Sequence, residues 1–234
     1  MERVSGAAEM SLTARGTRQL VKTFVVLTGL LFVPAGTWRF WQGWLYIGLM
    51  FGFWTYFFVD LLKSDPQLLE RRMQRRETEP QQRLLLRLVS LILFLAFMLA
   101  GVDFRFGWSR ALGSVPVALV LAGQVIVVAG YWLVFWTMKV NSFASSIIQV
   151  EAQQTVIDRG PYAWVRHPMY LGMALSALAL PLALGSYIAL PLFALLPLLL
   201  GYRLVHEERT LCRDLAGYAE YCQRVRYRLL PWVW

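Results

Sequence analysis

The side chains best able to bind a ligand or move a proton gather in two short polar segments. Residues 160–172 read GPYAWVRHPMYLG, and residues 203–209 read RLVHEER. Both histidines of the chain lie in these segments. The first segment offers cationic and hydroxyl groups that attract an anion, and the second offers two carboxylates that attract a cation. Together they match a small ligand that carries a carboxylate near a positive charge, as an amino acid does.

The first segment has the features of a helix start. Pro168 suits the first turn of a helix, where its missing N–H costs no hydrogen bond. Arg166 and His167 would then lie at the helix N-terminus, where free amides and the helix dipole favour an anion. Tyr162 and Tyr170 add hydroxyl donors. The structural alternatives are an arginine that reaches for the membrane surface and a histidine that caps the helix in water.

The second segment places two carboxylates next to each other in sequence. Glu207 and Glu208 lie about 100° apart on a helix, so only one of them is expected to face a ligand. The other is expected to hold Arg203 or Arg166. The competing interpretation is an i,i+4 ion pair between Arg203 and Glu207 at a membrane interface.

Long apolar runs surround both segments. The chain has 234 residues, 58% of them hydrophobic and 16% charged, and its mean hydropathy is +0.50. Average soluble domains are about 45–50% apolar and about 25% charged. The composition therefore excludes an ordinary soluble enzyme, a disordered chain and a secreted disulfide scaffold, and it indicates an integral membrane protein. Cys212 and Cys222 are too few for a four-ligand zinc site, so no metal is expected.

The elements that must position the polar segments are transmembrane helices. An all-α multi-pass bundle of about six such helices is predicted by apolar runs at residues 20–38, 41–62, 84–102, 112–138, 168–184 and 187–205. The turn-forming sequence 184–186 (LGS) separates the last two runs, which predicts a helical hairpin over residues 168–205. Pro168 and Leu204 each lie 18 residues from Ser186. At about 1.5 Å per residue both helices cross one membrane thickness. The hairpin therefore brings both polar segments to one membrane face, with the glutamates at the end of the returning helix.

Basic residues are distributed unevenly between the two sides of this bundle. If the helices alternate, one side carries only Arg39, Arg105 and Arg110 of the 23 Lys and Arg residues. The positive-inside rule then places both termini and the charged loop 63–83 in the cytoplasm, at a bacterial inner membrane or a eukaryotic endoplasmic reticulum. The loop is expected to form an amphipathic helix after Pro66. The asymmetry accounts for the net charge of +9 without a nucleic-acid partner.

Several features inside the spans are better explained by packing than by a site. The GxxxG pattern at residues 48–52 predicts close helix packing within the monomer. Gln124, in the middle of the fourth run, is expected to hydrogen-bond a neighbouring helix. Trp132, Phe135 and Trp136 fit an interfacial aromatic belt, with stacking on an aromatic ligand as the alternative.

The polar segments and the tail resemble the isoprenylcysteine carboxyl methyltransferase family, within a wider group of membrane methyltransferases that includes phospholipid N-methyltransferases. The resemblance covers residues 139–234 and rests on NSFASSIIQVEAQQTVIDRGPY (141–162), GPYAWVRHPMYLG (160–172), HEERTL (206–211) and GYAEYCQRVRYRLLPWVW (217–234). It implies a cytoplasm-facing pocket for S-adenosylmethionine, whose carboxylate, ammonium and sulfonium suit the two polar segments. The implied contacts are Gly160, Tyr162, Arg166, His167, Pro168, Tyr170, Gly172, Glu207 and Glu208.

The resemblance implies an enzyme that transfers a methyl group from S-adenosylmethionine to a lipophilic acceptor. The acceptor would be an isoprenylcysteine-like carboxylate, another lipid or a thiol, and it would enter from the membrane lipid. A carboxylate or thiolate needs no general base, whereas an amine would need one, and His167 and Glu208 are the candidates. Two alternatives stay open: a sterol-type reductase that uses NADPH, and a non-catalytic lipid-binding protein.

The chain is expected to divide into two regions. Residues 1–138 would form an N-terminal four-helix membrane region, and residues 139–234 the cofactor-binding region. Asn141, Ser142 and Phe143 are candidates for shaping the mouth through which the acceptor enters, with a helix cap as the alternative. The tail 218–234, which alternates aromatic and basic residues, is expected to lie on the membrane interface. The oligomeric state has no signal in the sequence.

Overall fold

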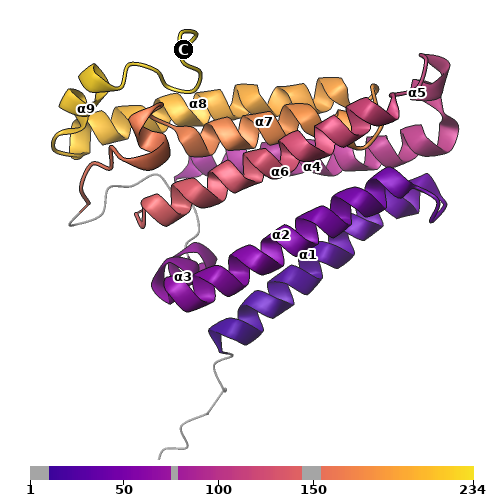
Figure 1. The fold of residues 1–234 in the computed structure, drawn as a ribbon, viewed down its shortest axis with the longest axis horizontal. Coiled ribbons are helices and arrows are strands. Elements are labelled where there is room, and N and C mark those ends of the chain that lie inside the picture. The colour runs from indigo at the N-terminus through magenta and orange to yellow at the C-terminus, as the bar shows by residue number, and fades with distance from the viewer. Residues whose placement is uncertain (1–10, 75–78, 144–153) are drawn as a thin grey trace, which may run out of the picture.

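The structure is a computed structural model that describes residues 11–74, 79–143 and 154–234. Every regular element in these residues is helical (Figure 1), so the predicted all-α fold class is confirmed. The elements, in chain order, are α1 (Leu12–Ala35), α2 (Trp41–Ser64), α3 (Pro66–Gln74), α4 (Pro80–Phe106), α5 (Trp108–Ala111), α6 (Val117–Val140), η1 (Gly160–Ala163), α7 (Pro168–Ala183), α8 (Leu190–Asp214) and α9 (Tyr218–Arg224).

Six of these helices run between the two ends of the molecule and alternate in direction (Figure 1). Within the described residues, five helices are long and apolar enough to cross a membrane: α1, α2, α4, α6 and α8. The sixth, α7, is apolar but has only 16 residues, which corresponds to about 24 Å at about 1.5 Å per residue. The protein is therefore a multi-pass membrane protein, in agreement with the prediction of about six helices.

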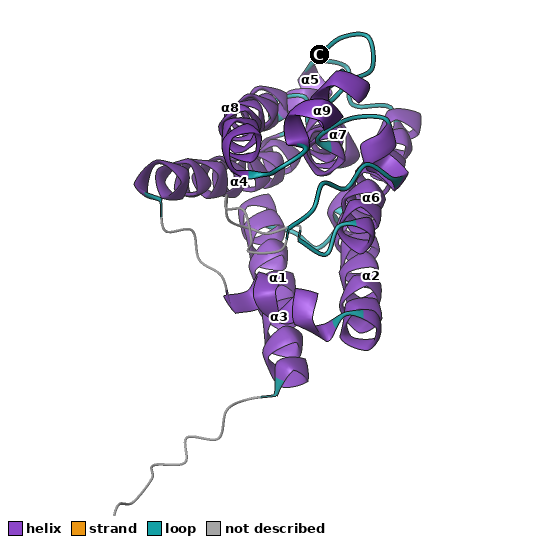
Figure 2. Cartoon of the chain, turned by 90° about the vertical axis from the view of Figure 1, so that its left-hand side faces the viewer, coloured by secondary structure: helices purple, strands orange, loops and turns teal. Residues whose placement is uncertain are grey.

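The six helices surround one shared core. Seen from the end (Figure 2), α1 packs on α2, α2 on α6, α6 on α7, α7 on α8, α8 on α4 and α4 on α1. All six helices contribute to the largest cluster of buried side chains, with Leu31, Met50, Phe97, Val127, Leu180 and Phe193 as examples. Large apolar side chains such as Val33, Val125 and Leu198 point outward and are exposed, as expected of helices that face lipid.

Close approach of α6 and α7 depends on two glycines. A Cβ atom built on Gly172 would lie 2.5 Å from the backbone oxygen of Gly130, and one built on Gly130 would lie 2.5 Å from the backbone oxygen of Gly172. The prediction of close packing at Gly48 and Gly52 is wrong, because no described atom lies within 4 Å of a Cβ built at either position. The GxxxG pattern marks close packing only where its small face meets another helix, and α2 turns its opposite side to the core.

Gln124 of α6 hydrogen-bonds to two neighbouring helices, and its position in the fourth apolar run predicts such a bond. Its side-chain nitrogen donates to the backbone oxygen of Ala183 at 3.0 Å and to that of Gln42 at 3.3 Å. Because such polar groups find no water inside a bilayer, these bonds tie α6 to α7 and to α2.

The predicted hairpin is present, and a buried carboxylate fixes its turn. Gly185 adopts a left-handed conformation, with a φ of 71°, just after α7. The Asp103 carboxylate accepts hydrogen bonds from the Ser109 amide at 2.7 Å and from the Ser186 hydroxyl at 2.5 Å. The Ser109 hydroxyl in turn accepts from the Tyr187 amide at 2.8 Å. This network joins the end of α4 to the turn between α7 and α8.

The returning helix is longer than predicted. Helix α8 continues to Asp214, so the glutamates lie within it and not at its end as expected at residue 205. The charged sequence that follows residue 205 contains no glycine or proline before Gly217, so nothing in it stops the helix.

The helix expected after Pro66 is also present, as α3. Its apolar residues Leu68 and Leu69 pack against Phe58 and Leu61 of α2. The Asp65 carboxylate accepts a hydrogen bond from the Leu68 amide at 2.9 Å, which caps the start of α3. Residues 75–78 of the same predicted loop lie outside the described residues.

Candidate functional site

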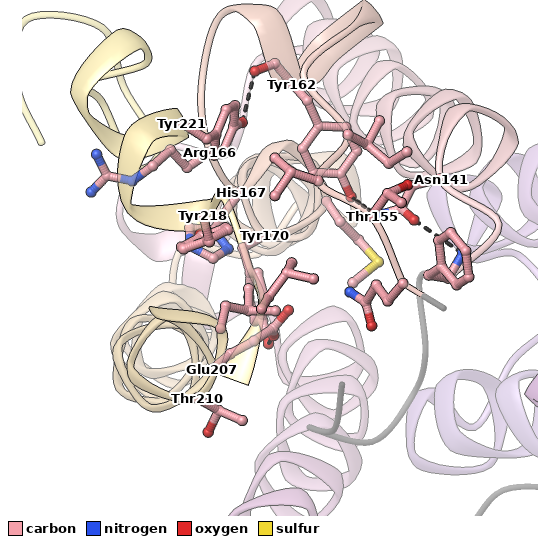
Figure 3. A pocket seen from close by; sticks show the side chains of 17 residues that line it. Asn141, Thr155, Tyr162, Arg166, His167, Tyr170, Glu207, Thr210, Tyr218 and Tyr221 are labelled. Atoms are coloured by element: carbon pink, nitrogen blue, oxygen red, sulfur yellow. Dashed lines mark hydrogen bonds between the residues drawn. The ribbon is translucent and has the colours of Figure 1, made fainter. Parts of the chain in front are cut away.

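A cavity lies at the end of the bundle where α6 ends and α7 begins (Figure 3). Five stretches of the described chain form its wall: the residues just after α6, the loop before η1, η1 itself, the start of α7 with the residues before it, and α8 with α9. The described residues that line it are Asn141, Phe143, Gln154, Thr155, Val156, Ile157, Tyr162, Arg166, His167, Met169, Tyr170, Glu207, Thr210, Leu211, Leu215, Tyr218 and Tyr221.

The predicted helix start is confirmed, and the tail holds it. Pro168 is the first residue of α7, and His167 is its N-cap. The Arg166 amide donates to the backbone oxygen of Tyr227 at 2.9 Å, and the His167 amide donates to that of Arg228 at 3.0 Å. The segment between η1 and α7 therefore pairs with the tail through the backbone.

Arg166 is buried and bonded to protein groups through Nε and Nη1. Its side chain is 8% exposed, and its Nε donates to the Oε1 atom of Glu208 at 2.7 Å. Its Nη1 donates to the backbone oxygens of Val225 at 3.0 Å and Arg226 at 2.9 Å. These partners argue against the alternative in which Arg166 reaches outward to the membrane surface.

The two glutamates face different partners, as their separation on a helix predicts. Glu207 lines the cavity and accepts a hydrogen bond from the Tyr170 hydroxyl at 2.5 Å. Glu208 is buried behind the wall, with Arg166 on one carboxylate oxygen and the Nε atom of Arg228 at 2.5 Å from the other. Glu208 is thus the glutamate that holds Arg166, and Glu207 is the one available to a ligand.

Arg203, the other expected partner, lies one turn before Glu207 on α8. It is buried, and its Nη1 donates to the Oε1 atom of Gln82 at 3.2 Å. Gln82 is fully buried on α4. This bond fixes α8 against α4 just below the cavity.

His167 lies between the cavity and Glu208. Its ring is 4% exposed, and its Nε2 atom is 3.7 Å from the Glu208 carboxylate, so it is not a cap in water. The Tyr218 hydroxyl lies 3.5 Å from the same nitrogen. Burial raises the pKa of the Tyr218 phenol well above its usual range, and nearby Cys222 and Glu208 raise it further. Tyr218 therefore stays a neutral hydroxyl beside the imidazole at any working pH.

A chain of hydrogen bonds through Tyr162 links α9 to the residues just after α6 on another side of the cavity (Figure 3). The Tyr221 hydroxyl donates to the backbone oxygen of Tyr162 at 2.8 Å, and the Asn141 side chain donates to the Tyr162 hydroxyl at 2.9 Å. The Asn141 side-chain oxygen accepts from the Phe143 amide at 3.0 Å. Asn141 and Phe143 line the cavity, while Ser142 is not among its lining residues.

Four of the residues implied by the resemblance are not among the described residues that line the cavity. They are Gly160, Pro168, Gly172 and Glu208. Gly160 starts η1 with a left-handed φ of 59°, and Gly172 lies in the contact of α6 with α7. These four residues therefore support the residues of the wall and do not themselves face the cavity.

The aromatic residues at the end of α6 pack against protein. The Phe135 ring centroid lies 5.1 Å from that of Phe57, and the Trp132 ring stacks on Tyr56 at 6.2 Å. Trp136 contacts Trp164 edge to face at 5.8 Å. None of the three α6 residues is among the described lining residues, which favours packing over stacking on a ligand.

The expected position of the tail on the membrane interface stays a prediction, and one face of its first part points inward. Tyr218 and Tyr221 are buried, and with Leu215 they form a small cluster that walls the cavity. The spacing of the two tyrosines puts them on one face of α9, which is a signal that the sequence did contain. No comparable pattern in the sequence indicated that residues 154–157 line the cavity. Residues 144–153 of the segment that resembles the family lie outside the described residues.

Comparisons with known proteins found one similar fold and several related sequences. The fold is similar to that of the eukaryotic intramembrane Ras methyltransferase ICMT, with a TM-score of 0.51 over 95% of this chain and 77% of that chain. At 18% sequence identity this likeness concerns the fold alone. The class that the fold defines is a multi-pass helical membrane protein. Residues 120–213 match the isoprenylcysteine carboxyl methyltransferase (ICMT) family.

Two further relatives share part of the sequence. Delta(14)-sterol reductase from Mus musculus is 33% identical over 136 residues, which is 52% of this chain and 32% of that protein. The uncharacterized protein YpbQ from Bacillus subtilis (strain 168) is 27% identical over 95 residues, which is 40% of this chain and 53% of that protein. The matches thus span about a third of the first protein and about half of the second.

Proposed function

We propose that this protein transfers a methyl group from S-adenosylmethionine to a lipophilic acceptor in the membrane. The observation that carries the proposal is that Glu207 lines one cavity together with Arg166, His167, Met169 and Tyr170. They come from the start of α7 and the two residues before it, and from α8, inside the region that matches the methyltransferase family.

The residues of the cavity suit the chemical groups of S-adenosylmethionine. Glu207 offers a carboxylate to the ammonium or the sulfonium, while the charge of Glu208 is already balanced by arginines. Val156, Ile157 and Leu211 provide an apolar wall for the adenosine, and tyrosine hydroxyls provide hydrogen bonds. When bound, the cofactor supplies an activated methyl group on a positively charged sulfur.

The chain itself contributes binding, alignment and the exclusion of water. Glu207 holds the cationic end, and the Tyr170 hydroxyl fixes the orientation of its carboxylate. The wall formed by Leu211, Leu215 and Tyr218 keeps water from the reacting atoms. Alignment of two reactants in this way accelerates displacement without a catalytic base. For an amine acceptor, His167 is positioned beside Glu208 to take up a proton.

The test is the affinity of the purified protein for S-adenosylmethionine, measured by titration calorimetry. Glu207→Gln removes the charge but keeps the size of the side chain, and we expect binding to weaken about 10–100-fold, the range of a charge-assisted hydrogen bond. Glu208→Gln is also expected to weaken binding, through Arg166. Glu220→Gln, on the exposed side of α9, is the control and should bind like the wild type. Wild-type affinity in both of the first two variants would overturn the proposal.

The proposal also covers the methyl acceptor, the orientation of the protein in the membrane and the division of the chain into two regions. The acceptor is a lipophilic small molecule or a lipidated substrate that enters from the lipid. The cavity end and both termini face the cytoplasm, as the distribution of basic residues indicates. The division at residues 138 and 139 stays a prediction.

The similarity to Delta(14)-sterol reductase supports a second candidate, an NADPH-dependent reductase of a sterol-like alkene. One assay separates the candidates: the protein is incubated with methyl-labelled S-adenosylmethionine and a lipid extract. Label in an organic-soluble product supports the methyltransferase. Reduction of the alkene with NADPH, without methyl transfer, supports the reductase, and cofactor binding without either reaction supports a binding protein.

A further inference from the structure

The tail segment 225–234, which follows α9, returns over the start of α7. Four hydrogen bonds join its first residues to Arg166 and His167. The Arg166 guanidinium donates to the backbone oxygens of Val225 and Arg226 at 3.0 and 2.9 Å. The backbone amides of Arg166 and His167 donate to the tail at 2.9 and 3.0 Å. The tail is therefore part of the structure that supports the cavity.

Arg228 is the charged side chain by which this tail reaches the glutamate pair. Its Nε atom lies 2.5 Å from the Oε2 atom of Glu208, whereas Arg166 binds the Oε1 atom at 2.7 Å. Glu208 is thus held between two guanidinium groups, one on each oxygen. The side chain of Glu208 is 8% exposed, so an oxygen that lost its partner would gain little contact with water.

The end of the tail in turn holds Arg228. The backbone oxygen of Trp234 accepts hydrogen bonds from the amides of Arg228, Leu229 and Leu230 at 2.9, 3.0 and 3.2 Å. The Arg228 guanidinium lies 5.4 Å from the centroid of the Trp234 ring, within range of a cation–π interaction. Trp234 also lies beside Gly201 of α8, where a Cβ would be 4.0 Å from the ring. Residues 228–234 therefore form a hydrogen-bonded turn that contacts α8.

We propose that Arg228 is a positioning residue of the methyl-transfer site, which acts through Glu208 on Arg166 and His167. Arg228 is not among the described residues that line the cavity, so it reaches a ligand only through other groups. Loss of Arg228 would leave one oxygen of a buried carboxylate without its charged donor. Glu208 would then turn toward another donor, and the ring of His167, 3.7 Å away, would lose its fixed surroundings. This inference rests on the proposed function.

The first test reads the position of His167 without any ligand. The chain has only two histidines, so the imidazole NMR signals of His167 and His206 can be assigned with one His206→Gln variant. In Arg228→Gln we expect the His167 signals to move, and in Arg228→Lys to return toward the wild type, because the charge on Glu208 is kept. The His206 signals should stay in place, because that ring faces Glu79 at 3.3 Å.

The matched control is Arg213→Gln, which makes the same change on α8 at an exposed arginine that pairs with Asp214. It should leave the His167 signals unchanged. If Arg228→Gln does not fold, Trp234→Leu replaces it, because it removes the ring beside the guanidinium without touching the cavity. Unmoved His167 signals in Arg228→Gln, or in Trp234→Leu where that variant stands in, would overturn the proposal.

The second test is the affinity for S-adenosylmethionine. We expect Arg228→Gln to weaken binding about tenfold, and Arg228→Lys to restore most of the affinity. Moved His167 signals with wild-type affinity would overturn the positioning role. Moved His167 signals in a protein whose wild type does not bind S-adenosylmethionine would overturn the proposed function and leave the contact of Arg228 with Glu208 supported.

Discussion

Two adjacent carboxylates in this protein have different surroundings because a helix separates neighbouring side chains by about 100°. Glu207 points into the cavity and meets the Tyr170 hydroxyl, whereas Glu208 is buried between Arg166 and Arg228. A buried carboxylate between two arginines is a support, since its charge is already balanced. A carboxylate on a cavity wall is available to a cationic ligand.

At the scale of single residues, Cys222 gives a pH-dependent prediction. Burial raises the pKa of its thiol to about 11, against the opposing effect of Arg166. The thiolate is the form that reacts with iodoacetamide. We therefore expect the alkylation rate of Cys222 in the folded protein to keep rising toward pH 11, whereas an ordinary thiol with a pKa of about 8.5 reaches its plateau near pH 10. Mass spectrometry of the tryptic peptide, which cleavage after Arg213 separates from Cys212, measures this rate.

The control for Cys222 is the same chain unfolded in detergent and urea. There the thiol is solvated, and its rate should follow an ordinary midpoint of about 8.5. At pH 8.5 the folded protein should react about 100-fold more slowly than this control, because only a small fraction of the thiol is ionised. Equal rates in the two states would contradict the burial of Cys222.

At the scale of elements, the contact of α6 with α7 carries the start of α7 and therefore the cavity. Gly172→Ala would put a methyl group 2.5 Å from the backbone oxygen of Gly130, so the two helices would have to separate. Overpacking of this kind costs about 1–3 kcal/mol. We expect the melting temperature in detergent to fall by several degrees, measured by circular dichroism.

Gly48→Ala is the matched control for this contact. It makes the same change in a helix where no described atom lies within 4 Å of the new methyl group. Because alanine favours a helix over glycine by about 0.5–1 kcal/mol, we expect an unchanged or slightly higher melting temperature. A fall in melting temperature as large as that of Gly172→Ala would show that Gly48 is closely packed, as the GxxxG pattern predicts.

At the scale of the whole molecule, alternation of the six helices places α3 and α9 at one end and α5 at the other (Figure 1). The cavity lies at the same end as α9, since Tyr218 and Tyr221 line it. The excess of basic residues lies at the cavity end, so we expect that end to face the cytoplasm. Cys212, which is exposed on α8, reports on the cavity end. A membrane-impermeant maleimide should label Cys212 in inverted vesicles and leave it unlabelled in intact spheroplasts.

The complementary variant for this topology is Ser114→Cys in a chain whose own cysteines are replaced by serine. Ser114 is exposed in the segment between α5 and α6, at the opposite end. It should be labelled from outside in intact spheroplasts. The reverse pattern for the two positions would contradict the predicted orientation.

Much of the fold follows from local features that can be read along the chain. Apolar runs of membrane length predict the six helices, the sequence around Gly185 predicts the hairpin, and Pro168 predicts the start of α7. The position of Gln124 in an apolar run predicts a bond to a neighbouring helix, because a polar group in lipid needs a protein partner. These inferences depend on composition and on contacts within a few residues, so they do not require the packing to be known.

Sequence reasoning failed where it had to say which face of a helix meets another helix, because that depends on the packing of the neighbouring element. The GxxxG pattern of Gly48 and Gly52 could not show which side of α2 meets the core. The true close contact, between Gly130 and Gly172, has no such pattern in either helix. The spacing of Tyr218 and Tyr221 in the tail puts them on one face of a helix, but it does not indicate that this face is buried beside the cavity.

By itself, the sequence determined that this is a helical membrane protein and that its Arg-His-Pro and Glu-Glu segments meet at one face. The physical reason is that lipid forces every span into a helix, and that a hairpin of known length fixes where its ends lie. Only the tertiary structure decided that Glu207 faces the cavity and that the tail holds Arg166. Arg166 and the Val225 oxygen are 59 positions apart in the chain, and no periodicity spans that distance. Their meeting depends on how α7, α8 and α9 pack together.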